Sequence, residues 1–313
     1  MTTSNTPLAG RTRLATAGAK AATIGTFGPR SRTRQVGSVL FQAVLLLGLG
    51  VAVVGLAAMI TWAIVEGAPR VNLKLFTNQP SPLDLDDAGY RPAILGSIYV
   101  ILGVLVLIVP LGVGAALYLE EYADKARWYN RAIELNVQNL AGVPSIVFGI
   151  LGVAFVARGP LSLGFIAAAG SITVGMLVLP TVIIAAREAI RAIPSSIREG
   201  ALALGATQWQ TIWRQVLPAA VSGILTGVIL AVARAIGEAA PLLLLGATIF
   251  VSWDPSFFEG AYTTLPVQIY NWATRPQSEY HELAAAGILV MLVLVLVMNS
   301  YAIWLRNRYE QRW

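Results

Sequence analysis

The stretch ILGSIYVILGVLVLIVPLGVGAALYL, residues 94–119, decides the fold class. It contains no Asp, Glu, Lys, Arg or His, and apolar side chains lie on every side of the helix that it predicts. Because each helical residue rises ~1.5 Å, about 20 apolar residues span a bilayer core ~30 Å thick. We therefore predict that this segment crosses a membrane.

Five further stretches have the same character, and a charged pair interrupts only one of them. They lie between Arg34 and Glu66, Glu134 and Arg158, Arg158 and Arg187, Arg214 and about Phe250, and Glu282 and Arg306. Hydrophobic residues make up 56% of the 313-residue chain and charged residues 12%, which leaves too little polar surface to cover a soluble domain. The sequence predicts one all-α integral membrane domain with six transmembrane helices.

Lys and Arg are distributed unevenly among the segments that join these helices. Sixteen of the 22 lie in the amino-terminal tail, the second and fourth loops and the carboxyl-terminal tail, whereas the alternate loops hold five. Short loops that remain in the cytoplasm carry the excess of basic residues, so both termini are predicted to be cytoplasmic. The net charge of +6 therefore reflects membrane topology, and we reject nucleic-acid binding.

The chain divides into four predicted segments. Residues 1–35 contain no acidic residue and are rich in Thr, Ser, Ala and Gly, which favours a basic disordered cytoplasmic tail over a transit peptide. Residues 36–90 hold the first transmembrane helix and an outer loop, 91–308 the remaining helices, and 309–313 a short cytoplasmic tail. The absence of an internal repeat disfavours a secondary transporter built from inverted repeats.

The fourth loop carries a pattern of its own, REAIRAIPSSIREGALALGATQWQTIWRQVLPAA, residues 187–220. Pro194 ends one helix, and Ser196 with Glu199 three residues later forms a predicted capping box for a short helix. Gly205 supplies a turn, Thr207 caps a second helix, and Pro218 closes the unit before the fifth span. The pattern predicts a helix, a glycine turn and a helix across the cytoplasmic face.

Apolar side chains in this loop require a partner that the loop itself does not supply. They are Leu202, Leu204, Trp209 and Ile212. Burial in the membrane interface is one possibility. Docking of a helix into a groove on a soluble protein is the other, and the residues alone leave both open.

The segment EGALALGATQWQTIWRQVLP, residues 199–218, resembles the EAA loop of ABC importer permeases. That resemblance implies a type I ABC importer permease core over residues 91–308, with the loop at about 195–218 acting as a coupling helix in a cleft of the ATPase subunit. Gly200 stands where the family usually has Ala. The residues implied to make that contact are Glu199, Gly200, Ala201, Leu202, Leu204, Gly205, Ala206 and Thr207.

The chain offers no site for nucleotide or metal chemistry. A P-loop needs a Gly-Lys-Ser/Thr sequence, and none of Lys20, Lys74 and Lys125 follows a Gly. The chain has no Cys, and its single histidine, His281, cannot build a multi-histidine metal site. We expect a chain that is not an enzyme and holds no cofactor or metal, with ATP and Mg²⁺ bound by a separate ATPase subunit.

A charged pair interrupts the fifth apolar stretch. Arg234 and Glu238 are four residues apart and share one face of a helix. A charge at mid-membrane costs about 2.5–3.5 kcal/mol, so both should face the bundle interior or an aqueous path. A self-neutralising pair that fixes helix packing is one interpretation. An anion path in which the guanidinium binds an oxyanion is the other.

The segment ARAIGEAAPLLLLGA, residues 233–247, is similar to a signature of phosphate importer permeases, specifically the PstA-like subunit. Residues 265–308 strengthen the match, and Ala239 stands where that family usually has Thr. The resemblance implies a high-affinity phosphate importer in the bacterial plasma (inner) membrane, in which a heterodimeric permease moves phosphate by alternating access. It implies a PstC-like sister permease, a PstB-like ATPase dimer and an extracytoplasmic PstS-like phosphate-binding protein as partners. Arg234 and Glu238 would then line the substrate path.

The outer loops leave their roles open. Residues 251–282 are acidic overall and rich in aromatics, which suits an aromatic belt or a surface for the binding protein. The first outer loop carries Asp84, Asp86 and Asp87, without the spacing of a calcium loop.

Three other functions remain as alternatives. A permease for another oxyanion or small solute would use the same machinery, and an ion-coupled transporter or channel would use the charged pair alone. An intramembrane hydrolase based on a serine and His281 is the weakest, because no serine motif accompanies that histidine.

Overall fold

The computed structural model describes residues 32–247 and 250–309. The chain separates into two parts, residues 1–61 and residues 62–313. Every regular element in the described residues is helical. This confirms the predicted all-α class.

The first part contains most of α2 (Arg32–Gly67), which continues past Thr61 into the second part. The segment Gly37–Arg70 is long and apolar enough to cross a membrane. A 3₁₀ turn, Ala68–Arg70, follows this helix. The predicted tail, residues 1–35, lies almost wholly outside the described residues.

The second part is a bundle built around α7 (Ala167–Arg191), which packs against α4 (Arg91–Leu117) and α10 (Leu217–Gly237). The long α13 (Ser278–Tyr309) packs beside α10. Small residues allow these helices to approach closely, as at Gly227, where an added Cβ would lie against the side chain of Ala185. Close backbone approach takes the place of the hydrophobic driving force that lipid does not provide.

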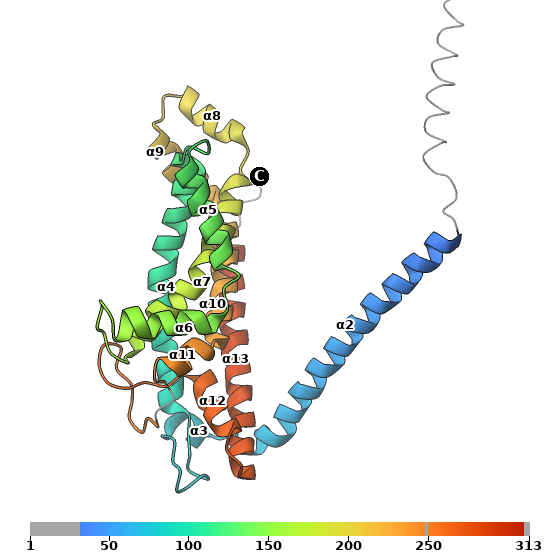
Figure 1. Cartoon of the computed structure of the whole chain (residues 1–313), viewed down its shortest axis with the longest axis vertical. Helices are drawn as coiled ribbons and strands as arrows, with labels where there is room; N and C mark the ends of the chain where they lie inside the picture. The colour runs from blue at the N-terminus through green and yellow to red at the C-terminus, as the bar shows by residue number, and fades with distance from the viewer. Residues whose placement is uncertain (1–31, 248–249, 310–313) are drawn as a thin grey trace, which may run out of the picture. The chain divides into compact units, whose positions relative to one another are not determined.

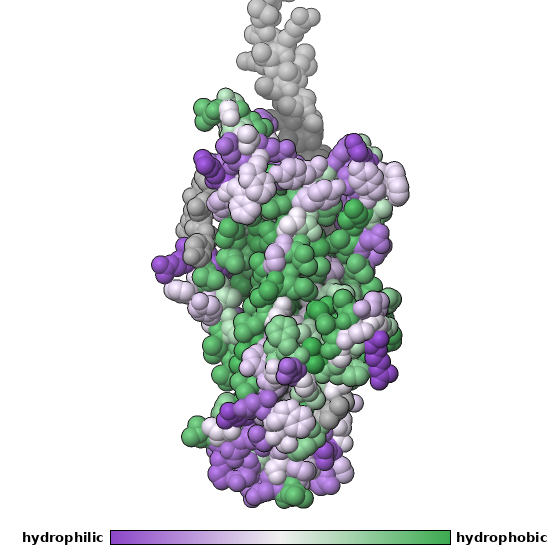
Figure 2. All heavy atoms as spheres, turned by 90° about the vertical axis from the view of Figure 1, so that its left-hand side faces the viewer, coloured by the Kyte–Doolittle hydropathy of each residue, from purple (hydrophilic) through white to green (hydrophobic). Residues whose placement is uncertain are grey.

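Short helices mark the two ends of the bundle (Figure 1). α8 (Ser195–Ala203) and α9 (Gln208–Thr211) lie at one end, and α3 (Leu73–Thr77) and α12 (Leu265–Ala273) lie at the other. Figure 2 shows a broad band of hydrophobic side chains between two hydrophilic ends. This banding is the surface expected of a protein that sits in a bilayer.

The third predicted span is bent rather than straight. α5 (Trp128–Leu140) and the helical segment Ser145–Ala157 meet at 110°. The second segment consists of α6 (Ser145–Leu151) and a π-helical turn, and α6 lies across the long helices (Figure 1). Pro144 causes the break, because its ring excludes a helical conformation at the preceding residue.

The fifth predicted span, Arg214 to about Phe250, is wrong at both ends. The helix begins at Gln208 and runs through a π-helical segment, Ile212–Val216, into α10 without interruption, so Pro218 does not close the loop. The wider π turn accommodates the Pro218 ring. At the other end the helix stops at Gly237, because Pro241 would clash with the carbonyl four residues earlier. A separate short helix, α11 (Ala240–Leu244), follows.

Five helices of the described chain are long and apolar enough to cross a membrane, and the bent pair raises the number to as many as six. The protein is therefore a multi-pass membrane protein. The predicted six spans correspond to this upper number.

Candidate functional site

Arg234 and Glu238 lie where α10 ends. The Arg234 Nε is 3.3 Å from the Glu238 Oε1, so the predicted i, i+4 pair is formed. The Arg234 side chain is 40% exposed and that of Glu238 is 16% exposed. Leu230 and Gly237 are exposed on the same stripe of α10. The guanidinium therefore lies on an open face of the described part, and the carboxylate lies at its edge.

The chain changes direction directly after this pair. Glu238 has an extended conformation, with ψ of 111°, and α11 then packs against α6. They approach closely at Gly149, where a Cβ would lie 2.8 Å from the Pro241 Cα. Two short helices thus meet beside the charged pair, and a glycine allows them to touch.

Buried hydroxyl groups lie beneath the same break, and sequence reasoning did not identify them. Tyr262, Thr263 and Thr264 have buried hydroxyls with no hydrogen-bond partner among the described residues. Thr264 lines a cavity of about 10 Å³ together with Ala235 and Ile236 of α10. The sequence signal for these hydroxyls is the Thr-Thr pair directly before Leu265.

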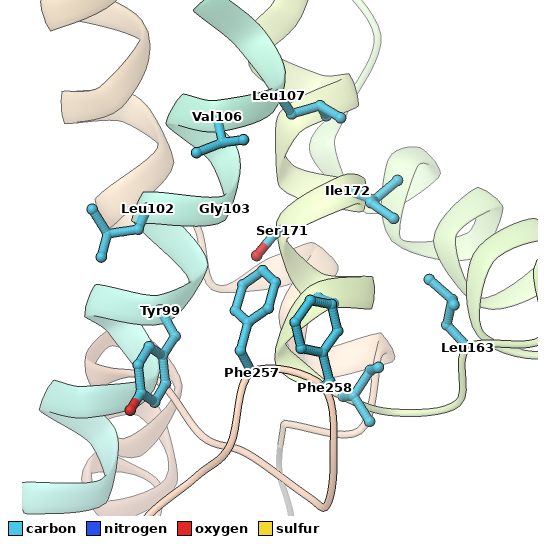
Figure 3. Close-up of a pocket in the computed structure, with 12 residues that line it drawn as sticks. Tyr99, Leu102, Gly103, Val106, Leu107, Leu163, Ser171, Ile172, Phe257 and Phe258 are labelled. Atoms are coloured by element: carbon cyan, nitrogen blue, oxygen red, sulfur yellow. The ribbon is translucent and has the colours of Figure 1, made fainter.

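A larger groove lies between α4 and α7 (Figure 3). Its volume is about 540 Å³, and Phe257 and Phe258 of the loop after α11 close its lower side. Ser171 is one of its few polar residues, and its hydroxyl already donates to the Ala167 carbonyl. No charged side chain lines this groove, so it cannot neutralise an anion.

The predicted helix, turn and helix are present at one end of the bundle, but the predicted cap of the first helix is wrong. α8 begins at Ser195, its N-cap is Pro194, and no side chain caps it, so the predicted capping box of Ser196 and Glu199 is wrong. The helix of the preceding span ends at Arg191, which leaves Pro194 itself at the start of α8. The capping box instead belongs to α9, where Thr207 accepts from the Gln210 amide and the Gln210 side chain accepts from Thr207.

Gly205 forms the predicted turn, with φ of +85°. Leu202, Leu204 and Trp209 are exposed, and the Leu204 side chain is 90% accessible. Ile212 is buried in the bundle. The prediction that it needs a partner outside the loop's own chain is therefore wrong.

The remaining predicted coupling residues share this surface. Glu199, Gly200 and Thr207 are exposed, and Ala201 and Ala206 are half-buried. No atom outside the local helix lies within 4 Å of a Cβ at Gly200, so the glycine relieves no steric clash within the chain.

A buried cluster of charges lies at the same end of the bundle. Glu120 is 7% exposed and pairs with Lys125, Arg187 and Arg191, at 2.8, 3.2 and 3.2 Å. Arg187 also pairs with Glu134 of α5 at 2.8 Å. Sequence reasoning counted these residues only for topology. Their pairing depends on tertiary packing, because about 70 residues separate Glu120 from its arginines.

Two of the acidic residues of the first outer loop, Asp86 and Asp87, are engaged in ion pairs, whereas Asp84 accepts hydrogen bonds from their backbone amides. Asp86 pairs with Arg70, which also binds Glu282 at 2.8 Å. Asp87 lies 2.5 Å from the Lys74 Nζ, and this hydrogen bond raises the pKa of Lys74. These carboxylates therefore join parts of the outer end to one another. His281 donates one hydrogen bond, from its Nε2 to the Arg275 carbonyl at 2.7 Å.

Comparison with known proteins places this arrangement in a family. Residues 108–311 match the family described as binding-protein-dependent transport system inner membrane component. The chain belongs to this family. It is 35% identical to the phosphate transport system permease protein PstA of Yersinia pestis over 277 residues, which cover 87% of this chain and 90% of that protein.

A second PstA, from Haemophilus influenzae, is 35% identical over 240 residues, covering 76% of this chain and 82% of that protein. The probable ABC transporter permease protein YqgI of Bacillus subtilis is 30% identical, and the match covers 83% of this chain and 92% of that protein. Members of this family are permease subunits and are not themselves enzymes.

Solved ABC transporters share the fold of this family member. A chain of a bacterial alginate ABC transporter aligns with a TM-score of 0.66 and 18% identity, covering 89% of this chain and 98% of that one. A chain of the MetNI methionine ABC transporter aligns with a TM-score of 0.55 and 15% identity, and the alignment covers 69% of this chain and 92% of that one. At these identities the likeness concerns the fold alone.

Proposed function

We propose that this chain is the transmembrane permease subunit of an ATP-driven importer of inorganic phosphate, and that it moves the ion by alternating access. The observation that carries the proposal is family membership together with 35% identity to permeases named for phosphate transport. The charged pair at the end of α10 supports it from the chemistry of the chain.

Phosphate suits both members of the pair. The Arg234 guanidinium can donate two hydrogen bonds to an oxyanion, and its partial exposure leaves donors free beyond the Nε that contacts Glu238. An ionised Glu238 can accept a hydrogen bond from a protonated phosphate oxygen. Sulfate has no proton to donate at neutral pH, so the same carboxylate would repel it. The pair therefore selects for phosphate over sulfate.

The exposed loop is the proposed attachment point for an ATPase subunit. Leu202, Leu204 and Trp209 present an apolar surface that a cleft in a soluble subunit would cover. The ATPase dimer would bind ATP and Mg²⁺. A sister permease would cover the open face of α10 that carries Arg234, and an extracytoplasmic binding protein would deliver phosphate to the end that contains α3 and α12.

The proposed location is the bacterial plasma membrane, with both termini in the cytoplasm. The excess of Lys and Arg in the termini and alternate loops supports this orientation. It places α8 and α9 on the cytoplasmic side, where an ATPase would reach them.

Transport by the assembled complex tests the proposal. Arg234→Gln and Glu238→Gln should each abolish phosphate uptake while the subunits still co-purify. Arg91→Gln, which removes an exposed ion pair with Asp254 at the outer end, is the matched control and should transport normally. Normal uptake in either variant of the pair would remove these residues from the path.

The alternative is an importer of the same architecture for another oxyanion or solute, since the fold also serves alginate and methionine transporters. Competition of labelled phosphate uptake by sulfate and molybdate separates the two. An ion-coupled transporter or channel would take up phosphate in vesicles that lack both ATP and an ATPase subunit.

A further inference from the structure

Two adjacent carboxylates at the end of α4 bind different parts of the molecule. The π-helical segment Tyr118–Tyr122 continues α4 and contains both Glu120 and Glu121. Glu120 binds arginines of α7, within the bundle. Glu121, which is 9% exposed, pairs instead with Arg198 of α8. The end of α4 is therefore joined both to the bundle and to the exposed loop.

Arg198 has the geometry of a strong ion pair. Its Nη2 and Nε donate to Glu121 Oε1 at 2.7 and 3.0 Å. Its remaining donors reach two backbone carbonyls, that of Ile193 just beyond α7 at 2.7 Å and that of Ile190 in the last turn of α7 at 2.8 Å. The side chain is 22% exposed, so the pair is largely shielded from solvent. A lysine could not make these four contacts, because its ammonium has three donors.

The second helix of the loop is held by the same residue. Gln208, at the start of α9, donates from its Nε2 to the Glu121 carbonyl at 2.7 Å. Glu121 thus fixes α8 through its carboxylate and α9 through its backbone. Among the described residues, these hydrogen bonds link both helices of the exposed loop to one point on α4.

The opposite side of the loop has no partner in the described chain. Glu199 follows Arg198 directly and is exposed, as are Leu202 and Leu204. The loop therefore has an inner face that is hydrogen-bonded to the end of α4 and an outer face that is open for docking. A force applied to the outer face reaches α4 through the Glu121–Arg198 pair, and α4 packs against α10, whose last turn carries Arg234.

We propose that Glu121 and Arg198 are positioning residues that transmit displacement of the exposed loop to α4. The pair makes the loop and α4 move as one body, while contributing nothing to the docking surface itself. This inference rests on the proposed function, because it assigns the displacement to an ATPase subunit that engages the loop.

The first experiment separates transmission from docking. Glu121→Gln and Arg198→Lys are assembled with the ATPase, sister permease and binding protein in proteoliposomes, and ATP hydrolysis is measured together with phosphate uptake. We expect the ATPase to co-purify normally and the ATP hydrolysed per phosphate to rise at least tenfold. Glu188→Gln is the matched control, because it removes an exposed ion pair with Arg191 on the same end and should leave the ratio unchanged.

The second experiment does not depend on the substrate. The chain has no Cys, so cysteines at Ala203 of α8 and Leu111 of α4 accept spin labels uniquely. In the parent complex the distance between the labels should stay the same, and narrowly distributed, with and without trapped ATP. In Glu121→Gln the distribution should broaden and shift when ATP is trapped.

Two results would overturn the inference. One is an unchanged label distance and an unchanged ATP-to-phosphate ratio in Glu121→Gln. The other is loss of the ATPase from the complex in proportion to the loss of uptake, which would make the pair an anchor of the docking surface only. Failure of the parent complex to take up phosphate, with the label distances as expected, would instead refute the proposed substrate.

Discussion

Replacing Gly149 with Ala tests the contact between α6 and α11. The added Cβ would lie 2.8 Å from the Pro241 Cα and 2.9 Å from the Leu244 Cδ1. Ordinary contacts between carbon atoms begin near ~3.5 Å, so one helix must move by roughly 0.7 Å. The Pro241 Cα belongs to the backbone and cannot rotate away. The clash must therefore displace α6 or α11 as a unit.

The expected cost follows from two opposing effects. Forcing an extra methyl group into a packed site costs about 1–3 kcal/mol. Alanine in place of glycine within a helix gains about 1 kcal/mol of propensity. Gly114→Ala in α4 is the matched control, because nothing lies within 4 Å of a Cβ there and only the gain applies. The two variants should therefore differ by about 1–3 kcal/mol in the free energy of unfolding.

Thermal unfolding of the purified complex at one fixed heating rate provides the assay, since membrane complexes unfold irreversibly and the midpoint then depends on that rate. A difference of 1–3 kcal/mol corresponds to a few degrees or more in a domain of this size. Gly149→Ala should also reduce phosphate uptake, because Pro241 lies three residues beyond Glu238. Equal midpoints for the two variants would show that α6 and α11 do not touch at Gly149.

Three further substitutions probe other parts of the structure. Glu120→Gln should destabilise the complex by about 3 kcal/mol, because it leaves the buried Arg187 with fewer carboxylates, and a loss below about 1 kcal/mol in thermal unfolding would contradict this. Gly205→Ala should lower the free energy of local unfolding of α8 and α9 by about 1–2 kcal/mol, because alanine is strained at the positive φ of this position. Hydrogen exchange of the backbone amides in α8 and α9 should then be faster by about 5–30-fold. Arg91→Gln should change the free energy of unfolding by less than about 1 kcal/mol, and by still less at high salt; a larger change would mean that its pair with Asp254 is not solvent-screened.

The long straight helices were predictable because lipid imposes a length and composition on each of them. α4 and α7 lie within their predicted apolar stretches or close to them, and they could be predicted without any periodic pattern of apolar residues. The two broken spans were not predicted. Pro144 and Pro241 were visible in the sequence, but a proline in a membrane helix kinks, breaks or merely weakens it according to what its neighbours supply. Here the two helices that follow the breaks, α6 and α11, pack against each other.

The candidate site was predictable to the extent that it is local. Arg234 and Glu238 are one helical turn apart, and Gly205 and Thr207 act on their own turn and cap, so spacing alone identified them. Pro194 takes the N-cap position in place of the predicted Ser196, because two start signals two residues apart compete for the same helix. The pairing of Glu121 with Arg198 joins residues 77 positions apart and left no local signal.

The unbroken helix from Gln208 to Gly237 joins the exposed loop to the charged pair on a single rod. At ~1.5 Å per residue, about 40 Å separate Gln208 from Arg234. A tilt of only about 5° around the loop end would carry the guanidinium sideways by roughly 3 Å, about the length of one hydrogen bond. The accuracy with which the helix is held in angle at Trp209 therefore determines how accurately the Arg234 guanidinium is placed against a bound ion.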